Sequence, residues 1–229
     1  MTRAQNRTDV TDRILASARV QLAEIGPAAL SLRAVARDIG MVSSAVYRYV
    51  ASRDELLTAL IVQCYDELGA AAEQGDSLHD RDDVRGRWMS VCGAIRTWAN
   101  AHPHEYALLY GSPVPGYVAP DNTIAPATRT TMVLVEIVVD AHRGDEAARE
   151  TGGVVYEGAR EFIRNDYRVR TGDDVDFIDD ALVMRTLSAW TTIFGTISFE
   201  RFGHLVGSVT DYAAFYDDVV ADLAERLGV

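Results

Sequence analysis

Apolar residues recur at three- and four-residue intervals along almost the whole chain, which is the period of amphipathic helices. Alternation with a period of two, which half-buried strands show, is hard to find. Glycine and proline interrupt the helical pattern and mark where helices end. The pattern therefore predicts an all-α protein. Helices are expected at residues 9–25, 32–39, 43–50, 53–72, 84–101, 105–110, 128–142, 145–168, 174–202 and 210–227.

Two junctions divide this helical pattern. Ser52 lies three residues before Glu55, the spacing of a capping box, and opens a longer helix that connects two parts of the chain. We therefore expect a small domain at 1–53 and a larger helical domain at 54–229. Within the larger domain, residues 111–127 hold four of the six prolines and are predicted to form a long irregular connection.

The first three predicted helices are short and closely spaced. The first ends at Gly26-Pro27, Ser31 is a predicted N-cap of the second, and Gly40 ends it one tight turn before the third. Two short helices joined by a turn that contains glycine are typical of a helix-turn-helix, whose second helix enters the major groove of DNA.

The third predicted helix has two different faces. Valines at 42, 46 and 50 recur every four residues and are expected to face inward. Ser43, Ser44, Tyr47 and Arg48 then lie on the opposite face. Arginine can bridge O6 and N7 of guanine, and hydroxyl groups donate to phosphates, so these side chains suit DNA.

Composition places the chain among ordinary globular proteins, with 48% hydrophobic and 24% charged residues. There is no apolar run of about 18 residues and no secretory signal at the start, so we expect a cytoplasmic protein without a membrane span. Cys64 and Cys92 lie in apolar helical patterns and indicate neither a disulfide nor a metal site. No cofactor motif is present; in particular, the absence of lysine excludes a P-loop.

Charge is distributed unevenly along the chain. All 22 basic residues are arginine, and the formal net charge is −12. Residues 1–53 hold eight arginines and four acids, a formal charge of +4, whereas the remainder holds 14 arginines and 30 acids, a charge of −16. Binding to a polyanion is therefore expected only at the beginning of the chain.

The stretch SLRAVARDIGMVSSAVYRYVASRDELL, with the preceding amphipathic helix and Gly26-Pro27, resembles the DNA-binding domain of tetracycline-repressor-type (TetR) transcriptional regulators over about 50 residues. The resemblance implies contacts with bases or phosphates from nine residues. These are Ser31, Arg33, Ser43, Ser44, Ala45, Tyr47, Arg48, Tyr49 and Arg53. For Tyr47 or Tyr49 taken alone, a place in the core of the small domain is an equal alternative.

The rest of the chain resembles the tryptophan-histidine-glycine (WHG) type of C-terminal domain in that family, through RTWANAHPHEYALLYGSP and AWTTIFGTISFERFGH. Such domains pair with a second copy and hold an effector cavity. Phe194 stands where relatives often have histidine, which favours an apolar pocket. The candidate pocket residues, each more often plain core, are Trp88, Trp98, His102, Met132, Tyr156, Phe162, Trp190 and Phe194. His102 is more often a residue that buttresses a turn.

Two carboxylate pairs are spaced one helical turn apart, Glu136 with Asp140 and Glu157 with Glu161. Such a pair could bind a cationic ligand or catalyse acid–base chemistry, but it is more often a solvated face. No nucleophile or metal set accompanies them, so an enzyme is the less favoured class.

The resulting hypothesis is a homodimeric, ligand-responsive repressor that leaves a palindromic operator when a small apolar or amphipathic effector binds. One short recognition helix reads few base pairs, so two copies are needed on adjacent major grooves. The last two helices, at about 181–202 and 210–227, are the candidate dimer interface. An activator or a regulator without an effector remains an alternative.

Overall fold

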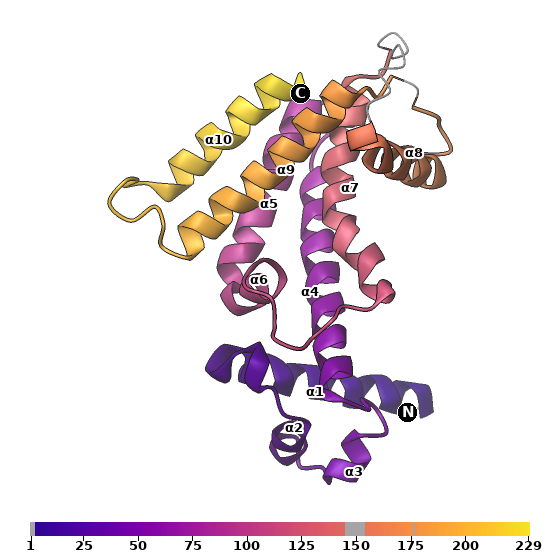
Figure 1. The fold of residues 1–229 in the computed structure, drawn as a ribbon, viewed down its shortest axis with the longest axis vertical. Coiled ribbons are helices and arrows are strands. Elements are labelled where there is room, and N and C mark those ends of the chain that lie inside the picture. Colours follow the sequence, from indigo (N-terminus) through magenta and orange to yellow (C-terminus); the bar gives the residue numbers. More distant parts are fainter. Residues whose placement is uncertain (1–2, 145–153, 176) are drawn as a thin grey trace. The chain divides into compact units, whose positions relative to one another are not determined.

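The computed structural model describes residues 3–144, 154–175 and 177–229, which form α-helices, short 3₁₀ turns and connecting segments (Figure 1). No β-strand occurs in this part of the chain, and the all-α prediction is confirmed. The elements are α1 Arg3–Ile25, η1 Pro27–Ala29, α2 Leu32–Asp38, α3 Ser43–Val46, α4 Arg53–Asp76, α5 Val84–Ala101, α6 Pro103–Tyr110, η2 Asp121–Thr123, α7 Ile124–Ala141, η3 Val154–Tyr156, α8 Glu157–Thr171, α9 Asp180–Arg201 and α10 Tyr212–Leu227.

Several helix boundaries differ from the predicted ones. Helix α7 begins at Ile124, four residues early, with Pro126 in its first turn, where backbone N–H groups have no partner within the helix. Helix α9 begins at Asp180 rather than 174, because the Asp179 carboxylate caps it by accepting from Leu182 N at 2.7 Å. Part of the helix predicted at 145–168 lies outside the described residues, and the rest is the 3₁₀ turn η3 followed by α8, which continues to Thr171.

The chain divides into two compact units. The first contains Met1–Glu67 and Ala101–Ala127, and the second contains Leu68–Asn100 and Thr128–Val229. Helix α4 therefore begins in the first unit and ends in the second. The sequence placed the boundary after residue 53 and assigned 101–127 to the larger domain, but in the structure this segment groups with the helix-turn-helix.

The core of the first unit explains that grouping. Ile14, Val46 and Leu57 are completely buried in one hydrophobic cluster formed by α1, α2, α3 and α4. Leu109 of α6 packs against the same cluster, as does Tyr117 of the following connection. Burial of these apolar side chains stabilises the unit, so α6 and the connection complete the core of the helix-turn-helix.

Polar contacts reinforce this attachment of α6. The Arg19 guanidinium on α1 is 2.6 Å from a Glu67 carboxylate oxygen and 3.7 Å from one of Glu105 on α6. The hydroxyl groups of Thr58 and Tyr117 are hydrogen-bonded at 2.9 Å. These contacts hold α1, α4 and the 103–117 segment together within the first unit.

In the second unit, α9 and α10 run side by side (Figure 1). Trp88 Nε1 of α5 donates to Val220 O of α10 at 2.9 Å, and the Tyr216 hydroxyl donates to Cys92 O at 3.0 Å. Arg96 forms a two-pronged ion pair with Glu200 of α9, with both bonds at 2.8 Å. Buried aromatic residues with satisfied polar atoms therefore fix α10 on α5.

Helix α7 is held against α4 by an arginine that lies across a glycine. Arg129 donates to both oxygens of Glu73, at 2.7 and 2.6 Å. A Cβ added at Gly69 would lie 2.6 Å from Cδ of Arg129, so the side chain passes where only glycine leaves room. Helices α7, α8 and α9 also share an apolar cluster that includes Met132, Ile163 and Val183.

None of the described helices has the length and hydropathy needed to cross a bilayer.

Candidate nucleic-acid interface and effector region

The turn between α2 and α3 has a defined geometry that depends on Gly40. The Met41 N–H donates to Ala36 O at 2.8 Å, and the Gly40 N–H donates to Arg37 O at 3.3 Å. This is the bond pattern of a Schellman motif, which requires a left-handed residue, and Gly40 has a φ of 70°. Arg13 of α1 also donates to Ile39 O at 2.6 Å, which further satisfies the end of α2.

Helix α3 is shorter than predicted. The α-helix ends at Val46, and the chain continues to Val50 through tighter turns, such as the bond from Tyr49 N to Val46 O at 2.9 Å. β-branched and aromatic residues, abundant here, have low helix propensity. The prediction that Val42 faces inward is wrong: it is 70% exposed because it precedes α3 in extended backbone. Val46 and Val50 are buried as expected.

Four of the nine predicted contact residues are exposed on this scaffold. They are Arg33 on α2, Ser44 on α3, and Tyr47 and Arg48 in the turns that follow. Ser43 is half-buried. Ser31 is the N-cap of α2: its hydroxyl accepts from Ala34 N at 3.4 Å, and its own N–H donates to Gln21 Oε1 at 3.0 Å.

Two predicted contact residues contribute to the core instead. Ala45 is only 9% exposed, so its methyl group is not available to a base, and we withdraw it from the contact set. Tyr49 is half-buried against the core, with the Arg7 guanidinium 5.8 Å from its ring centroid. For Tyr49 the alternative of a core position therefore accounts for its ring, whereas Tyr47 is exposed.

Arg53 has an intramolecular role that the sequence did not indicate. Its NH2 group donates to Pro27 O at 2.9 Å and to Ala28 O at 3.1 Å, and its NH1 group donates to Asp54 at 3.2 Å. The guanidinium thereby ties the start of α4 to the segment before α2. Because this charged donor satisfies two backbone carbonyls, it helps to position α2. This role is separate from a contact between Arg53 and a DNA phosphate.

Among the described residues, the predicted effector residues belong to different parts of the structure. Met132 and Tyr156 belong to the apolar cluster of α7 and α8, whereas Trp88 packs toward α10. The rings of Trp190 and Phe194 contact each other on α9, with centroids 5.8 Å apart and ring planes tilted by 52°. His102 lies in the first unit, at the N-cap position of α6, in agreement with a role at a turn.

Of the remaining two predicted effector residues, Phe162 of α8 is 41% exposed and Trp98 of α5 is buried. A void does occur between α7, α8 and α9, but its volume is only about 10 Å³, room for roughly one water molecule. None of the predicted residues lines it. The lining residues are Val135, Val138, Val139, Ile163, Ile178, Leu182, Val183 and Thr186.

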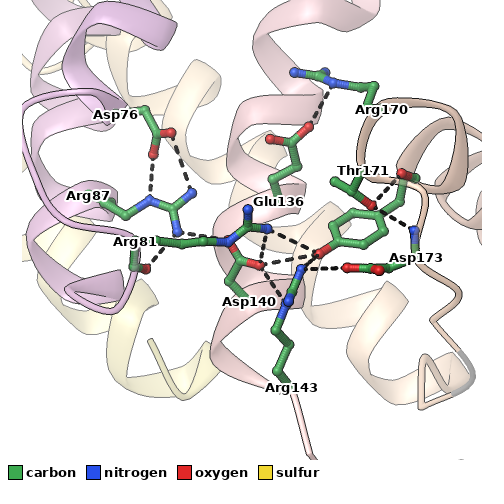
Figure 2. Close-up of polar contacts among 10 residues, drawn as sticks. Asp76, Arg81, Arg87, Glu136, Asp140, Arg143, Arg170, Thr171 and Asp173 are labelled. Atoms are coloured by element: carbon green, nitrogen blue, oxygen red, sulfur yellow. Dashed lines mark hydrogen bonds and ion pairs between the residues drawn. The ribbon is translucent and has the colours of Figure 1, made fainter.

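A network of buried charges in the second unit was not predicted (Figure 2). Asp140 of α7 has a side chain that is only 4% exposed, and its carboxylate accepts from Arg81 and from Arg87, each at 2.8 Å. Arg143 Nε lies 3.0 Å from the same carboxylate. The Tyr167 hydroxyl of α8 lies 3.3 Å from it. One carboxylate therefore joins α7 to α8 and to the connection between α4 and α5.

The surroundings shift the pKa of both acids on α7 in opposite directions. Burial alone would raise the pKa of Asp140, but hydrogen bonds from Arg81 and Arg87 outweigh it and hold the pKa below its ordinary value. Burial raises the pKa of Glu136, with its partner Arg170 opposing. The interpretation of Glu136 and Asp140 as a solvated face is thus wrong.

The other carboxylate pair, Glu157 with Glu161, does lie on an exposed face of α8. Two buried thiols are also accounted for. Burial raises the pKa of Cys64 to about 12, and Cys92 is fully buried with a raised pKa, so neither is reactive near neutral pH.

Comparison with known proteins identifies both parts of the chain. The family described as "Bacterial regulatory proteins, tetR family" matches residues 14–60, and "Tetracyclin repressor-like, C-terminal domain" matches residues 88–223. HTH-type transcriptional regulator Rv1816 of Mycobacterium tuberculosis is 38% identical over 98% of this chain and 96% of its own length. The regulator Mb1846 of Mycobacterium bovis matches to the same extent.

Solved structures agree with these matches. The crystal structure of regulatory protein SCO4313 is 30% identical, covers 98% of this chain and 100% of its own, and superposes with a TM-score of 0.75. The TetR-family regulator PfmR of Thermus thermophilus shares the fold, with a TM-score of 0.55, 16% identity and coverage of 91% of this chain and 97% of its own. Regulators of this family bind DNA and are not enzymes. The chain belongs to the TetR family of helix-turn-helix transcriptional regulators.

Proposed function

We propose that the chain is a homodimeric repressor that reads a palindromic operator through Ser44, Tyr47 and Arg48. The observation that carries the proposal is the exposure of these side chains at one end of a helix-turn-helix whose turn is fixed by a Schellman motif. Arg33 supplies contacts with phosphates. Further phosphate contacts come from the hydroxyl groups of the half-buried Ser31 and Ser43. The positive formal charge of residues 1–53 supports the same surface.

Arg48→Ala is expected to weaken binding to the operator by roughly 1–3 kcal/mol, the usual contribution of a bidentate arginine–guanine contact. Affinity for unrelated DNA should change less. The operator is first found by sequencing genomic fragments that the purified protein retains. Fluorescence anisotropy with operator and scrambled duplexes at several salt concentrations then measures both affinities.

Arg168→Ala is the matched control, since Arg168 lies on α8, outside the DNA-binding unit and the last two helices, and forms an exposed ion pair with Asp174. It removes the same charge from a solvent-exposed position. An Arg48→Ala variant with unchanged discrimination between operator and scrambled DNA would refute the base-reading role of Arg48.

Apolar exposure on α9 and after it supports a dimer through the last two helices. Met184, Leu187, Phe199 and Phe202 are exposed, and exposed apolar surface of this kind favours a protein partner. A groove of about 250 Å³ lies between α9 and α10. Its lining residues are Thr192, Gly195, Thr196, Phe199, Leu205 and Phe215. Antiparallel pairs from two copies would form a four-helix bundle.

Gly195→Arg is expected to break this dimer without unfolding the chain. A Cβ at position 195 meets no atom within 4 Å, so the single chain has room for the new side chain. In the dimer, an unpaired buried charge costs several kcal/mol, and the dissociation constant should rise by at least about 100-fold. Sedimentation equilibrium measures it.

Gly93→Arg on α5 is the corresponding control, because its Cβ also meets no atom within 4 Å. It should leave the dimer intact. Should Gly195→Arg dimerise like the natural chain, the interface would have to lie elsewhere.

The effector response completes the proposal. Helix α4 runs from the DNA-binding unit into the second unit, so a ligand that favours one arrangement of α4 shifts the population that can bind the operator. Transcription of the operator's genes in a deletion strain tests the sign: it should rise for a repressor. A fall would indicate the alternative, an activator, and no ligand dependence would indicate a regulator without an effector.

A further inference from the structure

The second unit contains a polar hollow beside the buried charge network. Its volume is about 230 Å³, and its walls come from the connection between α4 and α5 and from the end of α7. Sites for drug-sized ligands start at about 300 Å³, so this space suits a small ligand or the head group of a larger one. The lining residues are Arg81, Asp82, Val84, Asp140, Ala141 and Arg143.

The two lining arginines share one carboxylate. Arg81 and Arg143 both bind Asp140, whose other oxygen is taken by Arg87. Arg87 also donates to Asp76, at 2.7 Å. Arg143 also donates to the exposed Asp173, through a longer hydrogen bond of 3.2 Å. Arg81 is paired with Asp140 alone among the described acids. The wall is formally neutral, with two arginines and two aspartates, so an anion would be recognised through the arginine donors rather than through net charge.

Both arginines keep donors that no described residue uses. Arg81 bonds to Asp140 and to the Tyr167 hydroxyl only through NH2, which leaves its Nε and NH1 groups without a partner in the described chain. Arg143 uses Nε and NH2. Their side chains are 55% and 44% exposed, so the remaining N–H groups are accessible. The planar fork of a guanidinium matches the oxygens of carboxylate and phosphate.

The network beneath the hollow holds the arginines in place (Figure 2). Asp140 and Arg87 are almost fully buried, with side-chain exposures of 4% and 5%. Tyr167 has its hydroxyl in the network and its ring in the apolar cluster of α7, α8 and α9. The N–H groups of the two arginines are therefore held in position, and Tyr167 connects the network to the apolar cluster.

We propose that this hollow binds the carboxylate or phosphate group of a small organic anion, with Arg81 and Arg143 as the ligating residues and Asp140 as the residue that positions them. Asp82 also lines the hollow, is exposed and forms no ion pair with the described residues, so it opposes an anion there. Removal of the charge of Arg81 and removal of the charge of Asp82 are therefore expected to change the affinity for an anion in opposite directions. If the proposed effector response holds, such an anion is an effector, but its binding does not depend on DNA.

Isothermal titration calorimetry of the full chain without DNA tests the site. The probes are inorganic phosphate, acetate and hexanoate, each at constant ionic strength maintained with sodium chloride. Saturable binding of any of them is expected; phosphate alone would identify the head group as phosphate, and hexanoate above acetate would identify an organic carboxylate. Arg81→Gln should weaken binding roughly ten-fold or more, as loss of a charged hydrogen bond does. Asp82→Asn should strengthen it.

Arg168→Gln provides the same change of charge at an exposed ion pair with Asp174. It should leave binding unchanged. The proposal is overturned if no probe saturates, if Arg168→Gln weakens binding as much as Arg81→Gln, or if Asp82→Asn has the same sign as Arg81→Gln. Because DNA is absent, failure here leaves the proposed operator binding untouched, and failure of operator binding leaves this site untouched.

Discussion

Asp140→Asn is expected to lower the free energy of unfolding by about 3–5 kcal/mol, the range for removal of one partner from a buried ion pair. The amide that replaces the carboxylate carries no charge, so Arg87 keeps only Asp76 as a counter-ion while its side chain stays 5% exposed. The contact from Arg81 loses its charge as well. Urea denaturation followed by circular dichroism measures the loss.

Acid should reproduce part of this loss in the natural chain. The pKa of Asp140 lies below its ordinary value of 3.8 because the arginine hydrogen bonds outweigh burial. A lowered pKa in the folded state means that the carboxylate stabilises the fold fully above the unfolded value and that this contribution disappears as pH falls through the folded value. The natural chain should thus lose stability below about pH 3.8, and the Asp140→Asn variant should lose less over the same interval.

Asp174→Asn is the control for both measurements. Asp174 pairs with Arg168 of α8, and both side chains are more than half exposed. Surface pairs contribute at most about 1 kcal/mol, so this variant should unfold almost like the natural chain. Equal stability of the Asp140 and Asp174 variants would mean that the network does not hold α7 and α8.

The helix-turn-helix was predictable because its signals are local. Ser31, Gly40 and the Ser52–Glu55 capping box each act within a few residues, and each is found in its expected role, since Ser52 Oγ accepts from Glu55 N at 3.0 Å. The wrong prediction that Val42 faces inward also has a local cause. The four-residue spacing of the valines was extended to Val42, which lies one residue before the start of α3.

The buried network was not predictable, because its members are far apart in sequence. Arg81 and Tyr167 are separated by 86 positions, and nothing in the sequence pairs them. One signal was present: Glu136 and Asp140 interrupt an otherwise apolar run from Met132 to Ala141, and a carboxylate within an apolar run must find a cation when it is buried. The effector pocket stays a prediction, because large aromatic residues predict burial without indicating which of them share a cavity.

Gly111→Ala is expected to destabilise the first unit by about 1–3 kcal/mol, the usual cost of overpacking. Gly111 ends α6, where its N–H donates to Ala107 O at 2.9 Å. A Cβ at this position would lie less than 3.0 Å from that same carbonyl oxygen, and backbone cannot move aside as a flexible side chain can. The end of α6 must therefore shift.

That shift reaches the DNA-binding core. After Gly111, Val114 and Tyr117 pack against the core of the helix-turn-helix. Leu109, which precedes Gly111 on α6, packs against the same core. The variant should consequently show both a lower urea midpoint and weaker operator binding. Gly93→Ala, inside α5 with no atom within 4 Å of the new Cβ, should instead gain about 0.5–1 kcal/mol, because glycine is unfavourable within a helix.

The two measurements on Gly111→Ala separate two roles of the 103–117 segment. Lower stability with unchanged operator affinity would make the segment a structural brace alone. The core contacts of Leu109 and Tyr117 are expected to suppress local opening of α2 and α3. Lower stability and weaker operator binding, together with faster amide exchange in α2 and α3, would therefore show that the segment sets the geometry of the DNA-binding unit. An alanine variant as stable as the natural chain would contradict the steric account of Gly111.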